Sequence, residues 1–228
     1  MRMPVILALA VLLAACSGGT EGGDDRIRPI LSTVTAALRP APAPEPFTAT
    51  RASLSAAGFR GPLLIVANEA RGTRAGFVPE TTNRGAITWR SADDVTVRTR
   101  GGVLAATRGM LFDLMAADDA LFRQTLAAGG GRYVRAIRDL DAEGVLRRID
   151  LACTLTRGGA GAVAVLGRSY AVTRWSESCI GPEGPPYPNA PGGRIENFYD
   201  VDLGGAIRRS RQWAAPHLGY LVLELADI

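Results

Sequence analysis

Short apolar or alternating runs follow one another from Gly61 to the end of the chain, and Gly, Asn or Asp interrupts them roughly every eight to twelve residues. Alternation with a period of two is typical of strands that bury one face. No regular helix links successive strands, so the sheet should be mainly antiparallel, either closed as a barrel or stacked as a sandwich. The pattern therefore predicts an all-β fold of about twelve strands. The expected strands are 63–69, 74–78, 86–91, 95–99, 103–107, 133–140, 145–156, 161–166, 170–179, 195–202, 206–213 and 220–225.

Two segments depart from this strand pattern. Apolar residues at helical spacing predict a short amphipathic helix over 27–38, and residues 39–46 alternate Pro with small residues, which favours an extended spacer. A second short helix is expected over 118–128, with Asp118 as a candidate N-cap. The Gly-rich stretch 158–161 is expected to lie in a turn.

The amino terminus reads as a secretory signal. Arg2 provides a positive charge, and residues 5–15 form an uncharged apolar run that is shorter than the roughly 20 residues of a membrane span. The run ends in Leu-Ala-Ala-Cys, which resembles the bacterial lipobox, in which the cysteine is acylated, with palmitate expected among its acyl chains. Cys16 is thus the predicted lipidation site. Ser17 follows it where an Asp would hold a lipoprotein in the inner membrane, so the expected location is the periplasmic face of the outer membrane.

Four segments follow from these patterns. They are a lipoprotein signal peptide (1–15), a flexible Gly-rich tether (16–25), a short helix with a Pro-rich spacer (26–46) and a single β-rich domain (47–228). The apolar content of 47% is high enough for a sizeable core and excludes wholesale disorder.

The formal charge of +4 does not indicate a nucleic-acid partner. All basic residues are Arg, and both signs of charge are interspersed along the chain. A nucleic-acid-binding domain would be expected to concentrate its basic residues on one stripe. We expect no nucleic acid and no cofactor.

With Cys16 committed to lipid, Cys153 and Cys179 remain as an even pair in an oxidising compartment. Cys153 shares the parity of the apolar residues around it, and Cys179 ends another strand-like run. We predict a disulfide between two strands near the core, with two free buried thiols as the alternative. No metal site is expected, because two Cys and one His fall short of the four ligands of a structural zinc.

A search for catalytic residues yields no strong candidate. The sole His, His217, stands beside a Pro in a probable strand entry, and no Gly-x-Ser-x-Gly elbow occurs. Pairs of carboxylates suited to glycoside hydrolysis can be drawn from any chain with 22 acidic residues, so they indicate little. The acids available for such pairs are Asp93, Asp94, Asp118, Asp119, Glu177, Glu196, Asp200 and Asp202.

Aromatic and basic residues near strand ends offer candidate contacts for a polysaccharide or a partner protein. A Trp on a sheet can stack on a sugar ring, although Trp more often lies in a core. A run of Arg can meet an acidic polymer, although a solvated strand face is the plainer interpretation. The candidate contacts are Trp89, Trp175, Trp213, Arg208, Arg209 and Arg211.

Two stretches carry a family resemblance. The first extends from the run 87–93, which contains Trp89, to Leu114. The second lies in the last third of the chain and contains residues 195–202 and the Ser-Arg-Gln-Trp run 210–213, which is the most specific part. Together with the lipobox, these residues resemble the YjbF/GfcB lipoproteins of exopolysaccharide and group 4 capsule operons.

The resemblance implies a β-barrel-like fold on a lipid anchor and a non-enzymatic accessory role in polysaccharide production or export. It implies work beside an outer-membrane β-barrel exporter and a periplasmic polysaccharide-associated protein. A periplasmic polysaccharide-binding module and a carboxylate-dependent glycan hydrolase are the alternatives. No catalytic residue is carried over from the family.

Overall fold

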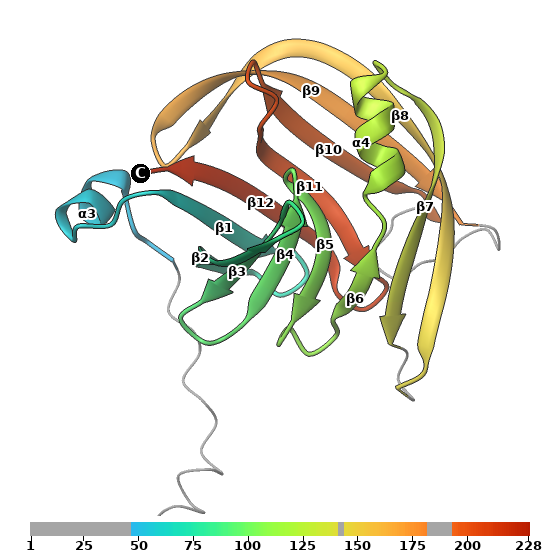
Figure 1. Cartoon of the computed structure of the whole chain (residues 1–228), viewed down its shortest axis with the longest axis horizontal. Helices are drawn as coiled ribbons and strands as arrows, with labels where there is room; N and C mark the ends of the chain where they lie inside the picture. The colour runs from blue at the N-terminus through green and yellow to red at the C-terminus, as the bar shows by residue number, and fades with distance from the viewer. Residues whose placement is uncertain (1–46, 141–143, 182–192) are drawn as a thin grey trace, which may run out of the picture. The chain divides into compact units, whose positions relative to one another are not determined.

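The alternating runs of the sequence form strands that pair in one antiparallel sheet. The computed structural model describes residues 47–140, 144–181 and 193–228, which belong to one compact unit that begins at Glu45 (Figure 1). Its strands are β1 (Pro62–Asn68), β2 (Thr73–Asn83), β3 (Ala86–Ser91), β4 (Thr96–Arg100), β5 (Val103–Arg108), β6 (Leu114–Ala117), β7 (Gly131–Leu140), β8 (Leu146–Val165), β9 (Arg168–Ile180), β10 (Ile195–Asp202), β11 (Ile207–Ala215) and β12 (Gly219–Asp227).

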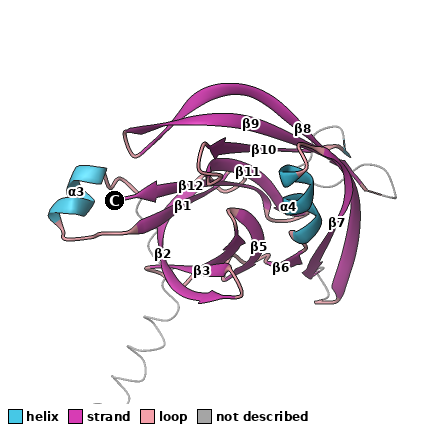
Figure 2. Cartoon of the chain, turned by 45° about the horizontal axis from the view of Figure 1, so that its top comes forward, coloured by secondary structure: helices cyan, strands magenta, loops and turns pink. Residues whose placement is uncertain are grey.

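The sheet is a meander that returns on itself. Within the described residues, the twelve strands lie in the order β5-β4-β3-β2-β1-β12-β11-β10-β9-β8-β7-β6, so the carboxyl-terminal strand lies beside the first strand. The edge strands β5 and β6 are therefore consecutive in the chain, and the sheet curves until these edges approach (Figure 2). This nearly closed barrel confirms the predicted all-β, antiparallel class and decides in favour of a barrel over a sandwich.

Side chains join the two edges of the barrel. The Leu114 N–H donates to the Thr107 hydroxyl at 3.0 Å, and the Arg108 guanidinium donates to the Leu114 carbonyl at 3.1 Å. The Asp113 carboxylate holds the connecting turn, because it accepts hydrogen bonds from the Thr107 hydroxyl at 2.7 Å and from the Gly109 N–H at 2.9 Å. An exposed strand edge invites pairing with another chain, and these bonds satisfy part of that edge from within the molecule.

The interior of the barrel is an apolar core with a polar centre. Along β10, Ile195, Asn197 and Tyr199 are buried on the inner face, while Phe198 between them lies on the outer face and is half-buried. The same alternation places inner residues on every long strand. The largest fully buried side chains are Trp213, Arg135, Tyr199, Phe122, Ile65, Leu104, Leu114, Ile137, Leu151, Leu155, Ile195 and Leu218.

A second, smaller core lies on the outer face of β1 and β12. Leu63 and Ile65 of β1 pack there with Val163 and Val172, which belong to the far end of the β8–β9 hairpin. The register between β8 and β9 shifts between Arg157 and Ala160, where β8 carries one extra residue. Because of this bulge, the odd-numbered residues of β8 face the barrel interior before the bulge and the outside after it. At the tip of the hairpin they therefore pack on the outer face of β1 and β12.

The Gly-rich stretch 158–161 was expected in a turn, and that prediction is wrong. These residues lie inside β8, where Gly158 approaches β9 so closely that a Cβ atom would lie 2.8 Å from the Arg174 carbonyl oxygen. The glycine is needed for backbone contact at the bulge. The sequence therefore predicted two strands where the structure has the single strand β8.

The other boundaries differ in smaller ways. β6 was not predicted, because its four residues show no clear alternation. The expected number of twelve strands is right only because β8 was predicted as two strands and β6 was missed. α4 (Ala120–Ala127) confirms the internal helix, but its N-cap is Asp119 and not the expected Asp118. The Asp118 carboxylate instead accepts the Ala120 N–H at 2.9 Å from the position before the cap. α3 (Arg51–Ala56) was not predicted, although Thr50 and Ser53 form a capping box. The helix expected over 27–38 lies outside the described residues.

Among the described residues, no helix is both long and apolar enough to cross a membrane.

Candidate functional site

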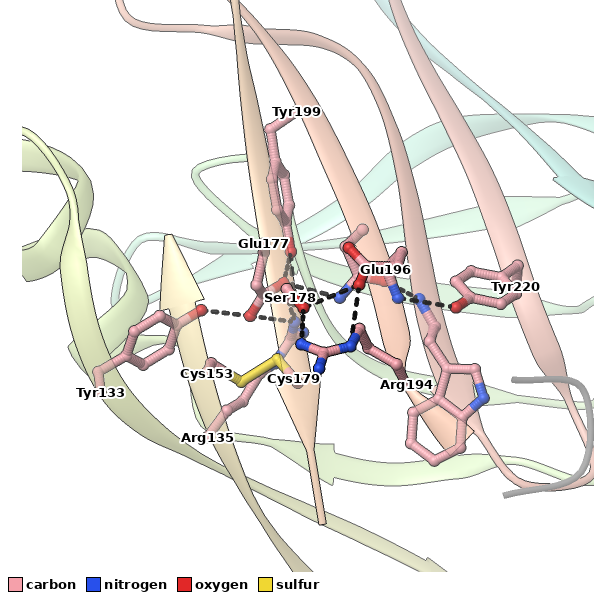
Figure 3. The surroundings of a disulfide bond; sticks show 12 residues. Tyr133, Arg135, Cys153, Glu177, Ser178, Cys179, Arg194, Glu196, Tyr199 and Tyr220 are labelled. Atoms are coloured by element: carbon pink, nitrogen blue, oxygen red, sulfur yellow. Dashed lines mark hydrogen bonds and ion pairs between the residues drawn. A yellow bond between two sulfur atoms is a disulfide. The ribbon is translucent and has the colours of Figure 1, made fainter. Parts of the chain in front are cut away.

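A carboxylate at the centre of the barrel accepts hydrogen bonds from side chains of two other strands, β7 and β10 (Figure 3). Glu177 of β9 is completely buried and accepts from Asn197 Nδ2 at 2.7 Å and from the Tyr199 hydroxyl at 2.7 Å. The Tyr133 hydroxyl also donates to it, and Arg135 Nη1 lies 3.2 Å from its Oε2. A buried carboxylate needs a cation and several donors, and this one has both.

The disulfide lies directly beside this polar cluster. Cys153 of β8 and Cys179 of β9 are opposite each other in the register, with 2.03 Å between their sulfur atoms, which confirms the predicted bond. Both cysteines are buried, and Cys179 follows Glu177 by two residues on the same face of β9. The two sulfurs and the Glu177 carboxylate lie within 4.8 Å of one another, but sulfurs joined in a disulfide are not the thiolates that bind a metal.

The electrostatics of the cluster favour its observed protonation. Burial raises the pKa of Tyr133 and of Tyr199 well above the usual tyrosine range, and the Glu177 charge adds to this effect. Both phenols therefore remain donors to the carboxylate. Burial works against the charge of Arg135, but Tyr199 and Glu177 outweigh it and leave the pKa of the guanidinium raised. The Glu177 carboxylate, the two phenols and Arg135 Nη1 bond one another, which is the arrangement of a structural network, while Arg135 Nε is buried without a partner among the described residues.

A second buried polar side chain, Gln212, bonds the edge strand β5 and the turn before it. Its amide oxygen accepts the Leu104 N–H at 2.9 Å, and its amide nitrogen donates to the Gly102 carbonyl at 3.0 Å. One fully buried side chain thus provides an acceptor for β5 and a donor for the turn that precedes it, as a neighbouring strand would do. Arg135 Nη2 lies 3.5 Å from the Leu104 carbonyl oxygen, so the polar centre and the edge strand are connected.

The candidate arginines all lie on the outer face of β11. A register shift between β10 and β11 gives β11 one extra residue, so the consecutive Arg208 and Arg209 both bond outer-face partners. Arg208 pairs with Asp202 and Asp227, at 2.6 Å in each case. Arg211 makes a two-pronged contact with Glu69 and lies over the Tyr220 ring.

Arg209 belongs to a different cluster, which it shares with the neighbouring strands. Asp200 accepts from Arg209 Nε at 3.2 Å, and it accepts from Arg174 Nε and Nη2 at 2.8 and 2.9 Å. The Phe198 ring lies beside both guanidiniums, whose central carbons are 4.5 Å (Arg174) and 5.9 Å (Arg209) from its centroid. The hydrogen bonds that Arg174 donates to Asp200 raise the pKa of Arg174 above its usual range. We name Arg174, Phe198, Asp200 and Arg209 the outer arginine cluster.

The candidate tryptophans do not join this cluster. Trp89, Trp175 and Trp213 are 3%, 6% and 1% exposed and all belong to the inner core. Trp89 Nε1 donates to the Thr99 hydroxyl at 2.9 Å, which satisfies its polar atom within the core. Their burial favours the core interpretation and removes the three rings as candidate contacts, because a buried ring offers no face to a sugar.

Two other candidates stand apart from the polar centre. His217 is exposed in the β11–β12 turn and lies 5.0 Å from the Phe112 ring between centroids. The predicted lipidation site Cys16 lies outside the described residues, as do the whole of the predicted signal peptide and tether.

Sequence reasoning missed Arg174 and Phe198 of the outer cluster and Tyr133, Arg135 and Tyr199 of the inner one. A signal for the inner cluster was present. Glu177 stands two residues from Trp175 and two from Cys179, so strand parity placed a carboxylate on a core face. A buried carboxylate requires a cation. Arg135 lies on the core face of the apolar strand β7 and provides one.

The fold and the two clusters define a nearly closed antiparallel barrel with a polar, disulfide-flanked centre and an arginine-rich outer face. The crystal structure described as the hypothetical lipoprotein YmcC from Escherichia coli (K12) has this fold, with a TM-score of 0.65 and 20% identity over 86% of this chain and 94% of that chain. A comparison with curated protein sequences gave no match.

The sequence model of the family described as "Group 4 capsule polysaccharide lipoprotein gfcB, YjbF" matches residues 33–225. The chain therefore belongs to this family of lipoproteins, as the resemblance of its sequence motifs indicated.

Proposed function

We propose that this lipoprotein is a non-enzymatic accessory factor in the production or export of an exopolysaccharide or capsule, anchored to the periplasmic face of the outer membrane. The family match over 33–225 carries the proposal, because it links the chain to capsule polysaccharide. The signal peptide, Cys16 and Ser17 support the anchor and the membrane.

The chemistry of the described residues supports a role without catalysis. Glu177 and Asp200 are buried and paired with arginines, so neither is free to transfer a proton to a substrate. The exposed His217 stacks on Phe112. A carboxylate-dependent hydrolase would need two acids about 5 to 10 Å apart on either side of a bound sugar. The pairing of Glu177 and Asp200 with arginines therefore also weighs against the glycan-hydrolase alternative.

The proposed partners are an outer-membrane β-barrel exporter and a periplasmic polysaccharide-associated protein. The lipid anchor would hold the domain within reach of both. The alternative of a polysaccharide-binding module loses its tryptophan platforms, since all three rings are buried. Its basic surface remains, on the outer face of β9 to β11.

The proposal is tested by secretion. A strain that lacks this gene is complemented with the native chain, with Cys16→Ala or with Ser17→Asp, and secreted polymer and membrane location are measured. We expect polymer only with the native chain: Cys16→Ala leaves the protein unanchored, and Ser17→Asp keeps it in the inner membrane. Full secretion in the deletion strain, or with the unanchored form, would contradict the proposed role.

The partners are tested in the complemented strain by crosslinking in whole cells. The native chain should crosslink to an outer-membrane barrel protein, and the inner-membrane Ser17→Asp form should not. Equal crosslinking of both forms would show that the contact is unspecific.

A further inference from the structure

Only some of the outer-face arginines can accept a ligand. Arg208 is bound by Asp202 and Asp227 and is 14% exposed. Arg211 donates three hydrogen bonds to the Glu69 carboxylate and a fourth to the Glu196 carbonyl. These two guanidiniums are occupied, so the basic run of β11 does not act as one continuous binding strip.

Arg174 and Arg209 differ because they share a single carboxylate. Asp200 has 2% of its side chain exposed, whereas the side chains of Arg174 and Arg209 are 47% and 32% exposed. The acid therefore lies beneath the two cations, and the surface above it carries guanidinium edges. Among the described residues, the Nη atoms of Arg209 bond no partner, and Arg174 Nη1 bonds none.

The two guanidiniums are also held in place before any ligand arrives. Asp200 lies opposite Arg174 in the β9–β10 register and opposite Arg209 in the β10–β11 register, so the three residues form one row across the sheet. Phe198 lies two residues from Asp200 on the same face and contacts both cations. Fixed donors lose little freedom on binding, which favours affinity.

We propose that the outer arginine cluster is a binding site for the carboxylate groups of an acidic polysaccharide. Guanidinium groups bind carboxylates through charge-assisted hydrogen bonds, and the free Nη atoms of Arg174 and Arg209 are the donors. The half-buried Phe198 ring lies under the Arg174 guanidinium and serves to hold these donors in place. The polymer class rests on the proposed function, and the site itself rests on the geometry of the cluster.

The test is titration of the full chain, purified in detergent, with polygalacturonate and with neutral dextran of similar length. The decisive variant is Arg174→Gln/Arg209→Gln. Because it leaves the buried Asp200 without its cations, Arg174→Gln/Asp200→Asn/Arg209→Gln is measured as well, and circular dichroism checks that each variant is folded. The matched control is Arg90→Gln/Arg148→Gln, which removes the same charge from ion-paired arginines that are 46% and 57% exposed.

We expect polygalacturonate to bind and dextran not to bind. Both cluster variants should lose at least tenfold in affinity, and the control should stay within about twofold, since charges removed elsewhere act only through a screened field. Three results would overturn the proposal: no binding by the native chain, an equal loss in the control, or a cluster that binds phosphatidylglycerol vesicles while polygalacturonate does not bind.

The site and the proposed function can fail separately. If the cluster variant no longer binds polymer in the titration but fully restores secretion in the deletion strain, the accessory role stands and the site is not part of it. If the deletion strain secretes normally, the accessory role is wrong, and the titration still decides whether the site binds acidic sugar.

Discussion

Replacing Glu177 with Gln should destabilise the barrel strongly. The change keeps the size of the side chain but removes its charge, and it places an NH2 group among the donors of Asn197, Tyr199 and Tyr133, where the carboxylate only accepted. Arg135, which is 1% exposed, would then be a buried cation without its anion. Breaking a buried ion pair on one side typically costs about 3–5 kcal/mol. For a domain of this size, that lowers the melting temperature by roughly 10 °C or more.

The measurement is guanidinium unfolding at equilibrium, followed by circular dichroism with the disulfide kept oxidised. Glu196→Gln is the matched control, because Glu196 precedes the same cluster on β10 but has 54% of its side chain exposed. We expect the control to change stability by no more than about 0.5 kcal/mol. The double variant Arg135→Met/Glu177→Leu should lose less than the two single changes added together, because it leaves no unpaired charge. If Glu177→Gln unfolds at the same denaturant concentration as Glu196→Gln, the polar centre does not hold the barrel together.

Three further outcomes follow from the structure. Gln212→Leu should cost about 2–4 kcal/mol in the same unfolding experiment, because it leaves the buried Leu104 N–H of β5 and the part-buried Gly102 carbonyl before it without their side-chain partner. Amide exchange should rise in β5. Gly158→Val should cost about 1–3 kcal/mol of stability, because its Cβ would press on the Arg174 carbonyl oxygen of β9. The control Gly159→Val should cost less, because no atom lies within 4 Å of the position of its Cβ. Equal losses of stability would contradict the role of Gly158 in the bulge. Burial raises the pKa of Asp202, but hydrogen bonds from Arg208 and from the turn outweigh it and lower the pKa below 3.8. The stability difference between the native chain and Asp202→Asn should therefore hold from pH 7 to about pH 4 and shrink as the pH falls through the lowered pKa; a difference that already shrinks near pH 6 would refute this assignment.

Strand parity made most of the barrel predictable, because a residue pattern of period two is local information. The strand over 195–202 was predicted with its observed bounds. Parity failed where a bulge changes the count of residues. The bulge in β8 made one strand look like two, and the bulge in β11 brought Arg208 to the same face as Arg209. Both depend on a neighbouring strand, which the sequence of a single strand does not reveal.

The partners of the charged residues were not predictable for the same reason. Asp200 meets Arg174 and Arg209 across two different register pairings, over 26 and 9 residues of chain. Nothing local marks these residues as a cluster. The disulfide was predictable because only Cys153 and Cys179 remained once Cys16 was assigned to the predicted lipobox, so the cysteine count left a single possible pair.

The residues of the Ser-Arg-Gln-Trp run, the most specific part of the family resemblance, make contacts inside the molecule. Ser210 and Gln212 point inward, where the Gln212 amide bonds the Ser210 hydroxyl and holds β5, and Trp213 lies in the core. Arg211 points outward but is tied to Glu69. Every member of the run is thus engaged within the barrel, and the most specific motif describes how this barrel closes. The polymer contact that we propose lies outside this motif, on the outer residues Arg174 and Arg209, which have free donors. A chain could keep the motif, and with it the fold, while changing these two arginines to suit a different polymer.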